Sequence, residues 1–543
     1  MKKTKNKIIA ISLIVAVTIS FSYKSDFFEI AKQIEIYTTL FKELNLYYID
    51  EVNPAEVTEK AINEVLKNLD PYTRFYDEQG VEDAKIRHEG QYGGVGASIV
   101  YREGNLIIRE IYKGYPAHNA GLLVGDKILK IDNAILKDQS EEITRAMLKG
   151  VPNSIIKVQV ERQNKKIDFN VTRETIEINP VPFYGMIDEE IGYISFIKFN
   201  KKASKEVKEA FLDLKSQGMK QLIIDVRHNP GGLLNEVIKI VNFFIPKNKV
   251  VVTTRSKLDK WSNTLKTRNE PLDTEIPIAI LIDNRSASAS EILAGALQDY
   301  DRAVIIGERS FGKGLVQRSR KLSYGTQLKL TISKYYTPSG RCIQELDYTN
   351  RDPKTGIVPK FSDGKVNAFK TEKGRTVYDG GGVAPDIKIE KPMQTAATKR
   401  LLTSDALFNY VTSYYYKNPK ISTAEDFILN ENEFKSLKEY LKNNSKNYEL
   451  SSEKALKKII ETIEKDDLNI KLQYDSLSNQ IQLEKLSSLD KNKDEILDQL
   501  TTKIVNRYYF KEGEYQQKIK FDKVIKESVK ILKNEKGYMS ILN

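Results

Sequence analysis

The sequence predicts a multi-domain α/β protein, and three observations support this fold class. Its 543 residues exceed the roughly 250 to 300 that a single hydrophobic core usually holds. Between residues 176 and 391, apolar strands alternate with amphipathic helices, which indicates a sheet covered by helices on both faces. Between residues 81 and 172, short β-like runs are separated by glycines, which predicts a compact β module.

The first residues have the pattern of an export signal. Four lysines precede an apolar run from Ile8 to Ser22. The run is shorter than the ~20 residues that a membrane-spanning helix usually needs, and no clear A-x-A cleavage box follows it. A cleaved signal peptide and an uncleaved membrane anchor therefore both stay open for residues 1–23. In either case we expect the bulk of the chain to lie outside the cytoplasm, in a periplasm or anchored to a membrane.

Four further regions follow this segment. Residues 24–80 carry apolar side chains at three- and four-residue spacing and predict a helical segment. Residues 81–172 form the β module, and residues 173–392 form the α/β core. Residues 393–543 are rich in Lys, Glu, Asn and Leu with long helical periods, which predicts a helical accessory domain. That region carries no chemical motif, and self-association or adaptor binding through it is a hypothesis only.

The composition excludes several classes of protein. A single cysteine, Cys342, excludes an internal disulfide framework, and the three histidines show no metal-ligand spacing. We therefore expect no metal and no cofactor. The net charge of +12 is spread along the chain and indicates a solvated surface, with attraction to anionic lipid or acidic partners as the alternative. Because no compact basic cluster is interleaved with aromatic residues, we do not expect nucleic-acid binding.

The stretch SASASE, residues 286–291, is the first of three candidate chemical motifs. Ser288 lies three residues before Glu291 at the start of an apolar run, which is also the pattern of an ordinary helix capping box. On this motif alone the cap is the favoured interpretation, but a serine at this position is also well placed as a nucleophile, because the backbone N–H groups at a helix start can stabilise an oxyanion. The motif itself contains no base.

A second motif, GERSFGKG, follows the apolar strand AVIIG. It resembles a phosphate-binding loop, but Gly314 stands where a hydroxyl should bind magnesium, and the next residues indicate a strand instead of a helix. Lys313 is then either a solvated surface charge or a general base, if burial keeps its amine neutral near pH 7 to 8. Because Ser–Lys pairs are a known variant of Ser–His–Asp catalysis, Lys313 offers the base that the first motif lacks.

The third motif is DVRHNPGG, from Asp225 to Gly232, at the end of the apolar strand QLIIDV. Its glycines fit an ordinary strand-to-helix turn, and they equally fit a turn whose backbone N–H groups face an oxyanion. His228 within this motif keeps a Ser–His pair open as an alternative.

These motifs together resemble the carboxyl-terminal processing proteases, also called tail-specific proteases, a family of serine peptidases with a Ser–Lys dyad and a PDZ domain. The resemblance covers about Glu29 to Lys391 and leaves the C-terminal helices outside it. It implies a protease core with a crotonase/Clp-like β-β-α spiral and an inserted PDZ domain. The further stretches that carry it are LDPYTRFY near Asp70, GYPAHNAGLLVGDKILKID, YYTPSGRCIQ and DGGGVAPDI.

The resemblance implies a role for each catalytic position. Ser288 is the nucleophile, Lys313 is the base 25 residues further on, and Gln317 orients the lysine amine. The oxyanion donors are the backbone N–H groups of three candidate residues, since either glycine of NPGG fits: Ala289, Gly231 and Gly232. In the PDZ domain, the resemblance implies a nest of backbone amides that holds the carboxylate of a peptide and includes Gly93, Gly94, Val95 and Gly96.

We therefore expect an exported serine endopeptidase that recognises the free C-terminus of protein or peptide substrates. One alternative is a catalytically silent PDZ adaptor that captures protein tails, although it would have no need of Ser288, Lys313 and Gln317. A weaker alternative is a crotonase-like acyl-transfer enzyme, which would not need a peptide-binding module.

Overall fold

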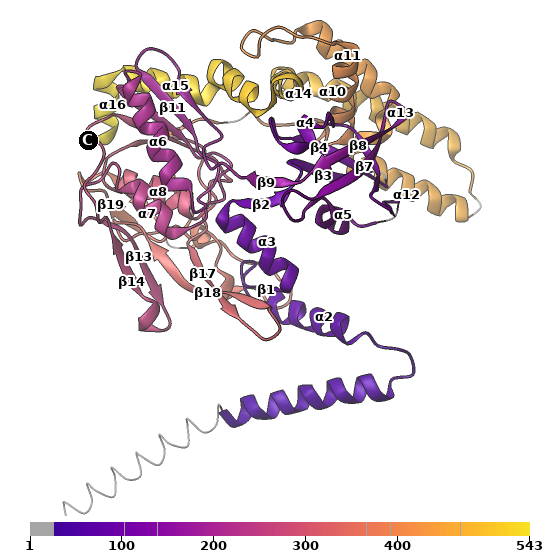
Figure 1. Cartoon of the computed structure of the whole chain (residues 1–543), viewed down its shortest axis with the longest axis horizontal. Coiled ribbons are helices and arrows are strands. Elements are labelled where there is room, and N and C mark those ends of the chain that lie inside the picture. Colours follow the sequence, from indigo (N-terminus) through magenta and orange to yellow (C-terminus); the bar gives the residue numbers. More distant parts are fainter. Residues whose placement is uncertain (1–26, 103, 138, 365, 391, 467) are drawn as a thin grey trace, which may run out of the picture. The chain divides into compact units, whose positions relative to one another are not determined.

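The computed structural model describes residues 27–543, apart from residues 103, 138, 365, 391 and 467 (Figure 1). The apolar run from Ile8 to Ser22 lies outside the described residues. The chain divides into two compact units. Among the described residues, one holds residues 27–77 together with Ser319–Thr331, and the other holds Glu78–Arg318 together with Ile332–Asn543.

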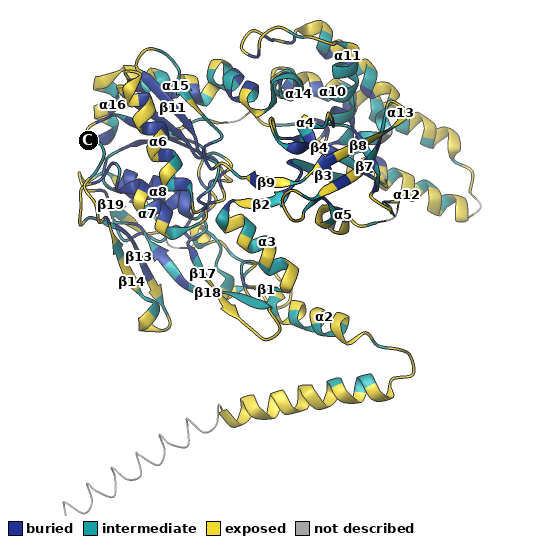
Figure 2. Ribbon diagram, in the orientation of Figure 1, coloured by how far each residue is buried: buried dark blue, intermediate teal, exposed yellow. Residues whose placement is uncertain are grey.

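The first unit contains the two helices that the apolar spacing predicts. Residues 27–47 form one helix, whose residues are mostly exposed, as Figure 2 shows. The second is α2 (Pro54–Lys67), and the side chain of Asn53 caps it by accepting hydrogen bonds from the first backbone N–H groups. The short strand β1 (Arg74–Tyr76) pairs antiparallel with the first residues of β18 (Gln327–Tyr336).

The second unit is built around a six-stranded sheet in the order β10–β11–β12–β15–β16–β21. The strand β10 is antiparallel to β11, and the other strands are parallel. Parallel neighbours need crossover connections, and the helices α6, α7 and α8 lie in the crossovers that join β11, β12, β15 and β16. The bounds are β10 (Phe183–Met186), β11 (Ile191–Ser195), α6 (Ala203–Ser216), β12 (Gln221–Asp225), α7 (Leu234–Val241), β15 (Ile278–Ile282), α8 (Ala289–Asp299), β16 (Val304–Gly307) and β21 (Ile387–Lys388).

Helices cover both faces of this sheet, as the continuous apolar strands predict. The helices α6, α7 and α8 pack on one face, and the strands and α8 are buried (Figure 2). The other face is covered by α15 (Lys523–Lys533) and α16 (Glu535–Leu542). Ile525 and Leu532 of α15 and Leu542 of α16 are buried in one cluster with strand residues such as Leu281. Each such side chain stabilises the fold by about 2 kcal/mol. Part of the region that we expected to be an accessory domain is therefore a layer of the core.

The strands β13, β14, β17 and β18 belong to a second sheet. The strand β13 (Val250–Ser256) pairs antiparallel with β14 (Asn263–Lys266) and with the last residues of β18. The strand β17 (Leu315–Lys321) forms a hairpin with β18. A small hairpin joins β19 (Ala368–Lys370) to β20 (Thr376–Tyr378).

The β module contains a sheet in the order β3–β4–β5–β7–β8, with β6 beside β5 and a separate β2–β9 pair. One segment differs from the prediction: we placed the β-like pattern from about Val81, but Glu78–Glu89 forms the helix α3. None of its residues is buried, so no apolar stripe marks it in the sequence. The other bounds are β2 (Gln91–Gly94), β3 (Ala97–Arg102), β4 (Asn105–Ile111), α4 (Pro116–Asn119), β5 (Lys127–Ile131), β6 (Ala134–Ile135), α5 (Glu141–Leu148), β7 (Ile155–Arg162), β8 (Lys165–Thr172) and β9 (Glu174–Glu177).

The C-terminal helices before α15 share a hydrophobic core of their own, which includes Leu407, Leu437 and Leu500. The long helix α14 is kinked at Phe510, where φ is 57° and ψ is −158°. Among the described residues, no helix combines the length and apolarity needed to cross a membrane. The bounds are α9 (Ala396–Leu402), α10 (Asp405–Lys417), α11 (Glu431–Asn443), α12 (Ser451–Lys465), α13 (Lys471–Ser488) and α14 (Lys493–Phe521).

Candidate active site

Ser288 lies at the turn between β15 and α8 in a strained backbone conformation. Its φ is 56° and its ψ is −112°, a region that a residue with a side chain adopts at a cost of about 1–3 kcal/mol. Neighbours hold it there: its N–H donates to the Glu291 carboxylate (2.7 Å), and its carbonyl oxygen accepts from the Tyr335 hydroxyl (3.1 Å). A strained serine between a strand and a helix is the arrangement that presents the nucleophile in α/β hydrolases.

The three alternating serines of SASASE differ in their surroundings. Ser286 and Ser290 are fully buried, and their hydroxyls donate to the carbonyl oxygens of Val226 (2.8 Å) and Asn229 (2.9 Å). These two serines therefore fasten the turn after β12 to the start of α8. Ser288, between them, is only half-buried. The alternation in the sequence thus separates two structural serines from one accessible serine.

The carboxylate of Glu291 is the centre of a buried network. One oxygen accepts hydrogen bonds from the Ser310 hydroxyl and the Gly312 N–H (2.6 Å each). The other accepts from the N–H groups of Ser288 (2.7 Å) and Lys313 (2.9 Å). Burial raises the pKa of Glu291 to about 6, although these four hydrogen bonds act in the opposite direction. One carboxylate therefore holds the backbones of both predicted catalytic residues.

The raised pKa of Glu291 predicts a pH-dependent stability. The ordinary pKa is 4.5 and the folded value is about 6, so the folded protein binds this proton more tightly than the unfolded chain does. The corresponding stability is fully present below pH 4.5 and is lost as the pH rises through 6, by about 2 kcal/mol. Urea unfolding of wild type and Glu291→Gln should show wild type losing that amount relative to the variant between pH 4.5 and 7. A constant difference would contradict the buried ionisation.

Lys313 lies on the glycine-flanked turn between β16 and β17, and its side chain is half-buried. Besides the bonds to Glu291, the turn is held by the Gly314 N–H, which donates to the Gln344 side chain (2.8 Å). Gln317 lies on β17 and is also half-buried. The backbone of the lysine-bearing turn is thus fixed on both sides of Lys313.

The NPGG turn lies directly against Ser288. A Cβ atom on Gly231 would lie 2.7 Å from the backbone nitrogen of Ala289 and 2.9 Å from the Cβ of Ser288, so only glycine fits there. The N–H of Gly231 donates to the Asn229 side chain (2.9 Å). The same turn pairs with Phe199 through two backbone hydrogen bonds. The Phe199 N–H donates to the Gly231 carbonyl oxygen (3.2 Å), and the Leu233 N–H donates to the Phe199 carbonyl oxygen (2.7 Å). The N–H of Gly232 takes no part in this pairing.

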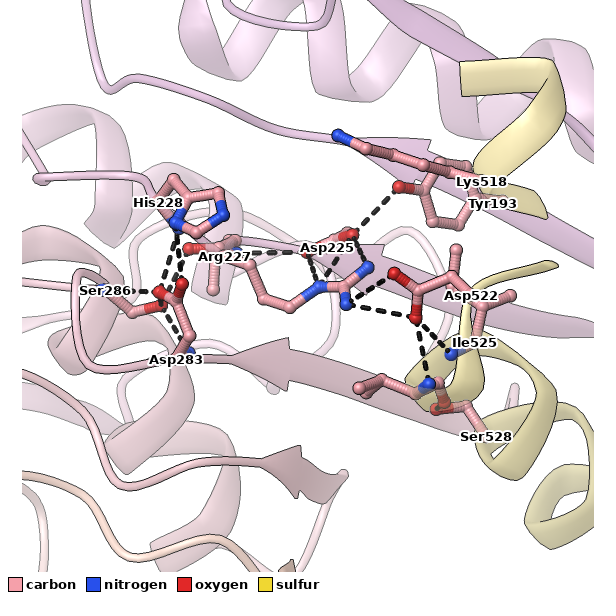
Figure 3. A network of polar contacts seen from close by, with 12 residues as sticks. Tyr193, Asp225, Arg227, His228, Asp283, Ser286, Lys518, Asp522, Ile525 and Ser528 are labelled. Carbon is pink, nitrogen blue, oxygen red and sulfur yellow. Dashed lines mark hydrogen bonds and ion pairs between the residues drawn. The ribbon is translucent and has the colours of Figure 1, made fainter. Parts of the chain in front are cut away.

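His228 forms a pair with Asp283 at the edge of the same turn. The His228 Nδ1 atom lies 2.6 Å from a carboxylate oxygen of Asp283, and the His228 backbone N–H donates to the other oxygen (2.9 Å), as Figure 3 shows. Burial alone would raise the pKa of Asp283, but the contacts with His228 hold it well below its usual range. The His228 side chain is 53% exposed.

The β module contains a groove between β3 and α5 with a volume of about 510 Å³. Its apolar lining includes Val95 and Leu148, and the cations on its α5 side are ion-paired: Arg145 with Glu141, and Lys149 with Asp83 (2.7 Å). Among the predicted peptide-binding residues, Val95 lines the groove, and the neighbouring Gly93 and Gly94 pair with β9. Gly96 has a φ of 73°, and a Cβ atom there would overlap the Tyr115 side chain. An extended peptide can add to the edge of β3 in such a groove.

The described residues contain no group of three or more His, Cys, Asp and Glu side chains placed to hold a metal ion.

Three family models match the chain. Peptidase family S41 matches residues 190–357, a PDZ domain matches residues 93–172, and the C-terminal helical domain of probable PDZ-proteases matches residues 397–532. Together with the strained serine and the groove between β3 and α5, these matches define a PDZ-containing serine peptidase. The C-terminal match also extends the likeness to a region that the sequence resemblance did not include.

Two relatives show the family. A carboxy-terminal-processing protease of Bartonella bacilliformis is 33% identical over 324 residues, which cover 59% of this chain and 74% of that protein. A probable CtpA-like serine protease of Staphylococcus aureus is 32% identical over 339 residues, which cover 60% of this chain and 67% of that protein. The chain belongs to the carboxy-terminal-processing proteases and is a serine-type endopeptidase. The family and fold class predicted from the sequence are confirmed.

Solved structures include similar chains. The photosystem II D1 C-terminal processing protease has a TM-score of 0.37 and 25% identity, and the match covers 65% of this chain and 86% of that one. The PDZ domain of a carboxy-terminal protease from Vibrio cholerae, in complex with a peptide, has a TM-score of 0.16 and 23% identity. That match covers 16% of this chain and 98% of that domain.

Proposed function

We propose that this endopeptidase cleaves peptide bonds with a dyad of Ser288 and Lys313. The observation that carries the proposal is the Glu291 carboxylate, which accepts hydrogen bonds from the backbone N–H groups of both residues (2.7 and 2.9 Å). The strained backbone of Ser288 supports the same assignment, because such strain persists where the surrounding structure enforces it and is concentrated at active sites.

In this mechanism, the Ser288 hydroxyl oxygen attacks the carbonyl carbon of the scissile bond, and its proton passes to the neutral Lys313 amine. The tetrahedral intermediate then expels the amine of the leaving segment, which takes the proton from Lys313. Water, deprotonated by the same lysine, releases the acyl group from Ser288. Gln317 is assigned to hold the lysine amine, because a neutral amide does not favour the protonated form as a carboxylate would.

The oxyanion of the intermediate is assigned to two backbone donors. Ala289 is the first residue of α8, where N–H groups have no partner within the helix. Between the two NPGG glycines, Gly232 is the better candidate, because the Gly231 N–H already donates to the Asn229 side chain. Gly231 then serves to let the turn approach Ser288 closely.

Cleavage of an unfolded protein tests this proposal. Purified wild-type protein should degrade fluorescently labelled casein, and Ser288→Ala should lose at least about 10³-fold in rate, because no other group supplies the nucleophile. Persistent cleavage by Ser288→Ala would show that the nucleophile lies elsewhere.

A second candidate for the base is His228, and the Asp283 contact favours it specifically. A histidine held by a buried carboxylate is the second half of a Ser–His–Asp triad. In this alternative Lys313 would be a structural residue, and activity would depend on His228.

Tail recognition is assigned to the groove of the PDZ domain. The backbone at Val95 and Gly96, between β2 and β3, and the exposed edge of β3 suit an extended chain end with a free carboxylate. We expect amidation of a peptide substrate's C-terminus to raise KM about tenfold, because it removes the carboxylate that backbone N–H groups would bind. Matched free and amidated peptides test this in the same cleavage assay. Equal KM values would remove the PDZ groove from substrate selection.

We also propose export of the chain and contact with a membrane through its first residues. The four lysines before the apolar run from Ile8 to Ser22 support this. Fractionation of cells expressing the full chain tests it, and recovery in the cytoplasm would contradict it.

Self-association through residues 393–543 stays a prediction. Truncation after Pro392 would also uncover the core sheet beneath α15 and α16, so surface substitutions are the better test.

A further inference from the structure

The guanidinium of Arg227 joins the catalytic core to the C-terminal helices. Its Nε and Nη2 atoms donate to Asp225 at distances of 2.6 to 3.1 Å, and its Nη1 atom donates to both carboxylate oxygens of Asp522 (3.1 and 2.9 Å). The Tyr193 hydroxyl completes the cluster by donating to Asp225 (2.9 Å). Figure 3 shows the guanidinium between the two carboxylates.

This cluster is largely buried. The side chain of Arg227 is 14% exposed and that of Asp522 is 20% exposed. Burial alone would lower the pKa of Arg227, but the two carboxylates raise it well above its usual range. Arg227 is therefore a fixed cation whose position depends on both carboxylates.

Asp522 comes from the junction between α14 and α15. Its carboxylate caps α15 by accepting hydrogen bonds from the N–H groups of Val524 (2.8 Å) and Ile525 (3.1 Å). The helix α15 is in turn anchored on the sheet by its buried Ile525 and Leu532. The carboxylate that meets Arg227 is thus held by a rigid part of the fold.

Arg227 begins the turn that leads to the NPGG glycines. The backbone N–H of the next residue, His228, donates to Asp283 (2.9 Å), and the carbonyl oxygen of Asn229 accepts from the Ala287 N–H (3.0 Å) and the Ser290 hydroxyl (2.9 Å). Ala287 and Ser290, which make the contacts with Asn229, lie on either side of Ser288 in the chain. A displacement of Arg227 would therefore be transmitted to the turn that lies against Ser288.

We propose that Asp522 is a positioning residue for proteolysis: by holding Arg227, it fixes the turn that presents the oxyanion donor beside Ser288. This inference rests on the proposed roles of Ser288 and Gly232. It makes the junction of α14 and α15 a part of the catalytic apparatus, because the active-site turn takes its position from a residue of the C-terminal region.

The variant Asp522→Asn isolates the ion pair from the helix cap. Asparagine caps a helix as well as aspartate does, so α15 keeps its first turn. The amide has no charge for the guanidinium, and its NH₂ group is a donor that faces another donor. We expect kcat on labelled casein to fall about tenfold with KM changed less than twofold, because a misplaced oxyanion donor weakens only the transition state.

A matched control is Lys533→Gln, which removes another ion pair between α15 and the core. Lys533 lies 2.6 Å from Asp188, on the loop between β10 and β11. If Asp522 acts only by docking α15, both variants should have the same kcat, and that result would overturn the proposal. The proposal expects near wild-type kcat for Lys533→Gln.

A double-mutant cycle tests the route through Arg227. In an Arg227→Ala background, Asp522→Asn should have no further effect on kcat, because the group it acts on is gone. A full additional tenfold loss would overturn the proposal. Ser288→Ala in the same assay distinguishes a failure of the positioning role from a failure of the proposed active site. If it is inactive while Asp522→Asn matches wild type, only the positioning role fails, and if it stays active, the site and the positioning role fail together.

Discussion

Lys313→Arg is expected to lower the cleavage of labelled casein by at least about 10³-fold, although the variant keeps the positive charge. A lysine with its ordinary pKa of about 10.4 is almost wholly protonated at neutral pH, so a lysine base must be held neutral by its surroundings. A guanidinium does not release its proton in this range and cannot accept one from Ser288. The rate loss measured at saturating substrate reports the missing proton transfer.

The comparison with His228→Ala decides between the two candidate bases. The backbone bond between Lys313 and Glu291 does not involve the lysine side chain, so Lys313→Arg should keep the turn and the fold intact. We expect His228→Ala to keep most of the wild-type rate. An active Lys313→Arg together with an inactive His228→Ala would assign the base to the histidine.

Gly231→Ala is expected to reduce kcat at least about 100-fold. A Cβ atom at this position would lie 2.5 Å from the carbonyl oxygen of Ala287 and 2.7 Å from the nitrogen of Ala289. Both are backbone atoms, so no flexible side chain can move away, and the turn must shift relative to Ser288. A shift of about 1 Å in a catalytic group is enough to cost such a factor.

Gly356→Ala is the matched control for this substitution. Gly356 also has a positive φ, 71° against 88° at Gly231, but a Cβ atom there meets no other atom within 4 Å. It therefore carries the backbone strain of the substitution without the steric contact. Similar kcat values for the two variants would contradict the close approach of the NPGG turn to Ser288.

Local patterns in the sequence predict the core of the fold well. The strands QLIIDV and IPIAILID are continuous apolar runs because they are buried on both faces, and the structure has them as β12 and β15. The helix α8 follows from the apolar residues after Ser288. Such elements are predictable because burial imposes a period on residues that are neighbours in the chain.

The covering layer from α15 and α16 was not predictable in the same way. Apolar spacing indicates that these segments are helices with a buried face, but it does not indicate which surface receives that face. The pair of Arg227 and Asp522 joins positions 295 residues apart, and neither residue belongs to a motif that marks the other. Only the fold brings such residues together.

The candidate site, like the fold, is predictable from the sequence only where local motifs mark its residues. Motifs locate Ser288, Lys313 and the NPGG turn, because each requires particular residue types at short spacing. The sequence did identify Glu291 as a helix-cap residue, but its bonds to the Lys313 turn require knowledge of how two distant loops meet. The alternation in SASASE was visible, yet its division into buried and accessible serines depends on the turn after β12.

Covalent labelling by an alkyl fluorophosphonate, which reacts with an activated serine, tests the assignment of the nucleophile directly. Peptide mass spectrometry of the labelled wild-type protein should place the phosphonyl adduct on Ser288. Neither Ser288→Ala nor Lys313→Arg should be labelled, because one lacks the nucleophile and the other lacks its base. An adduct on a different serine, with cleavage of casein blocked at the same time, would contradict the assignment of Ser288 as the nucleophile.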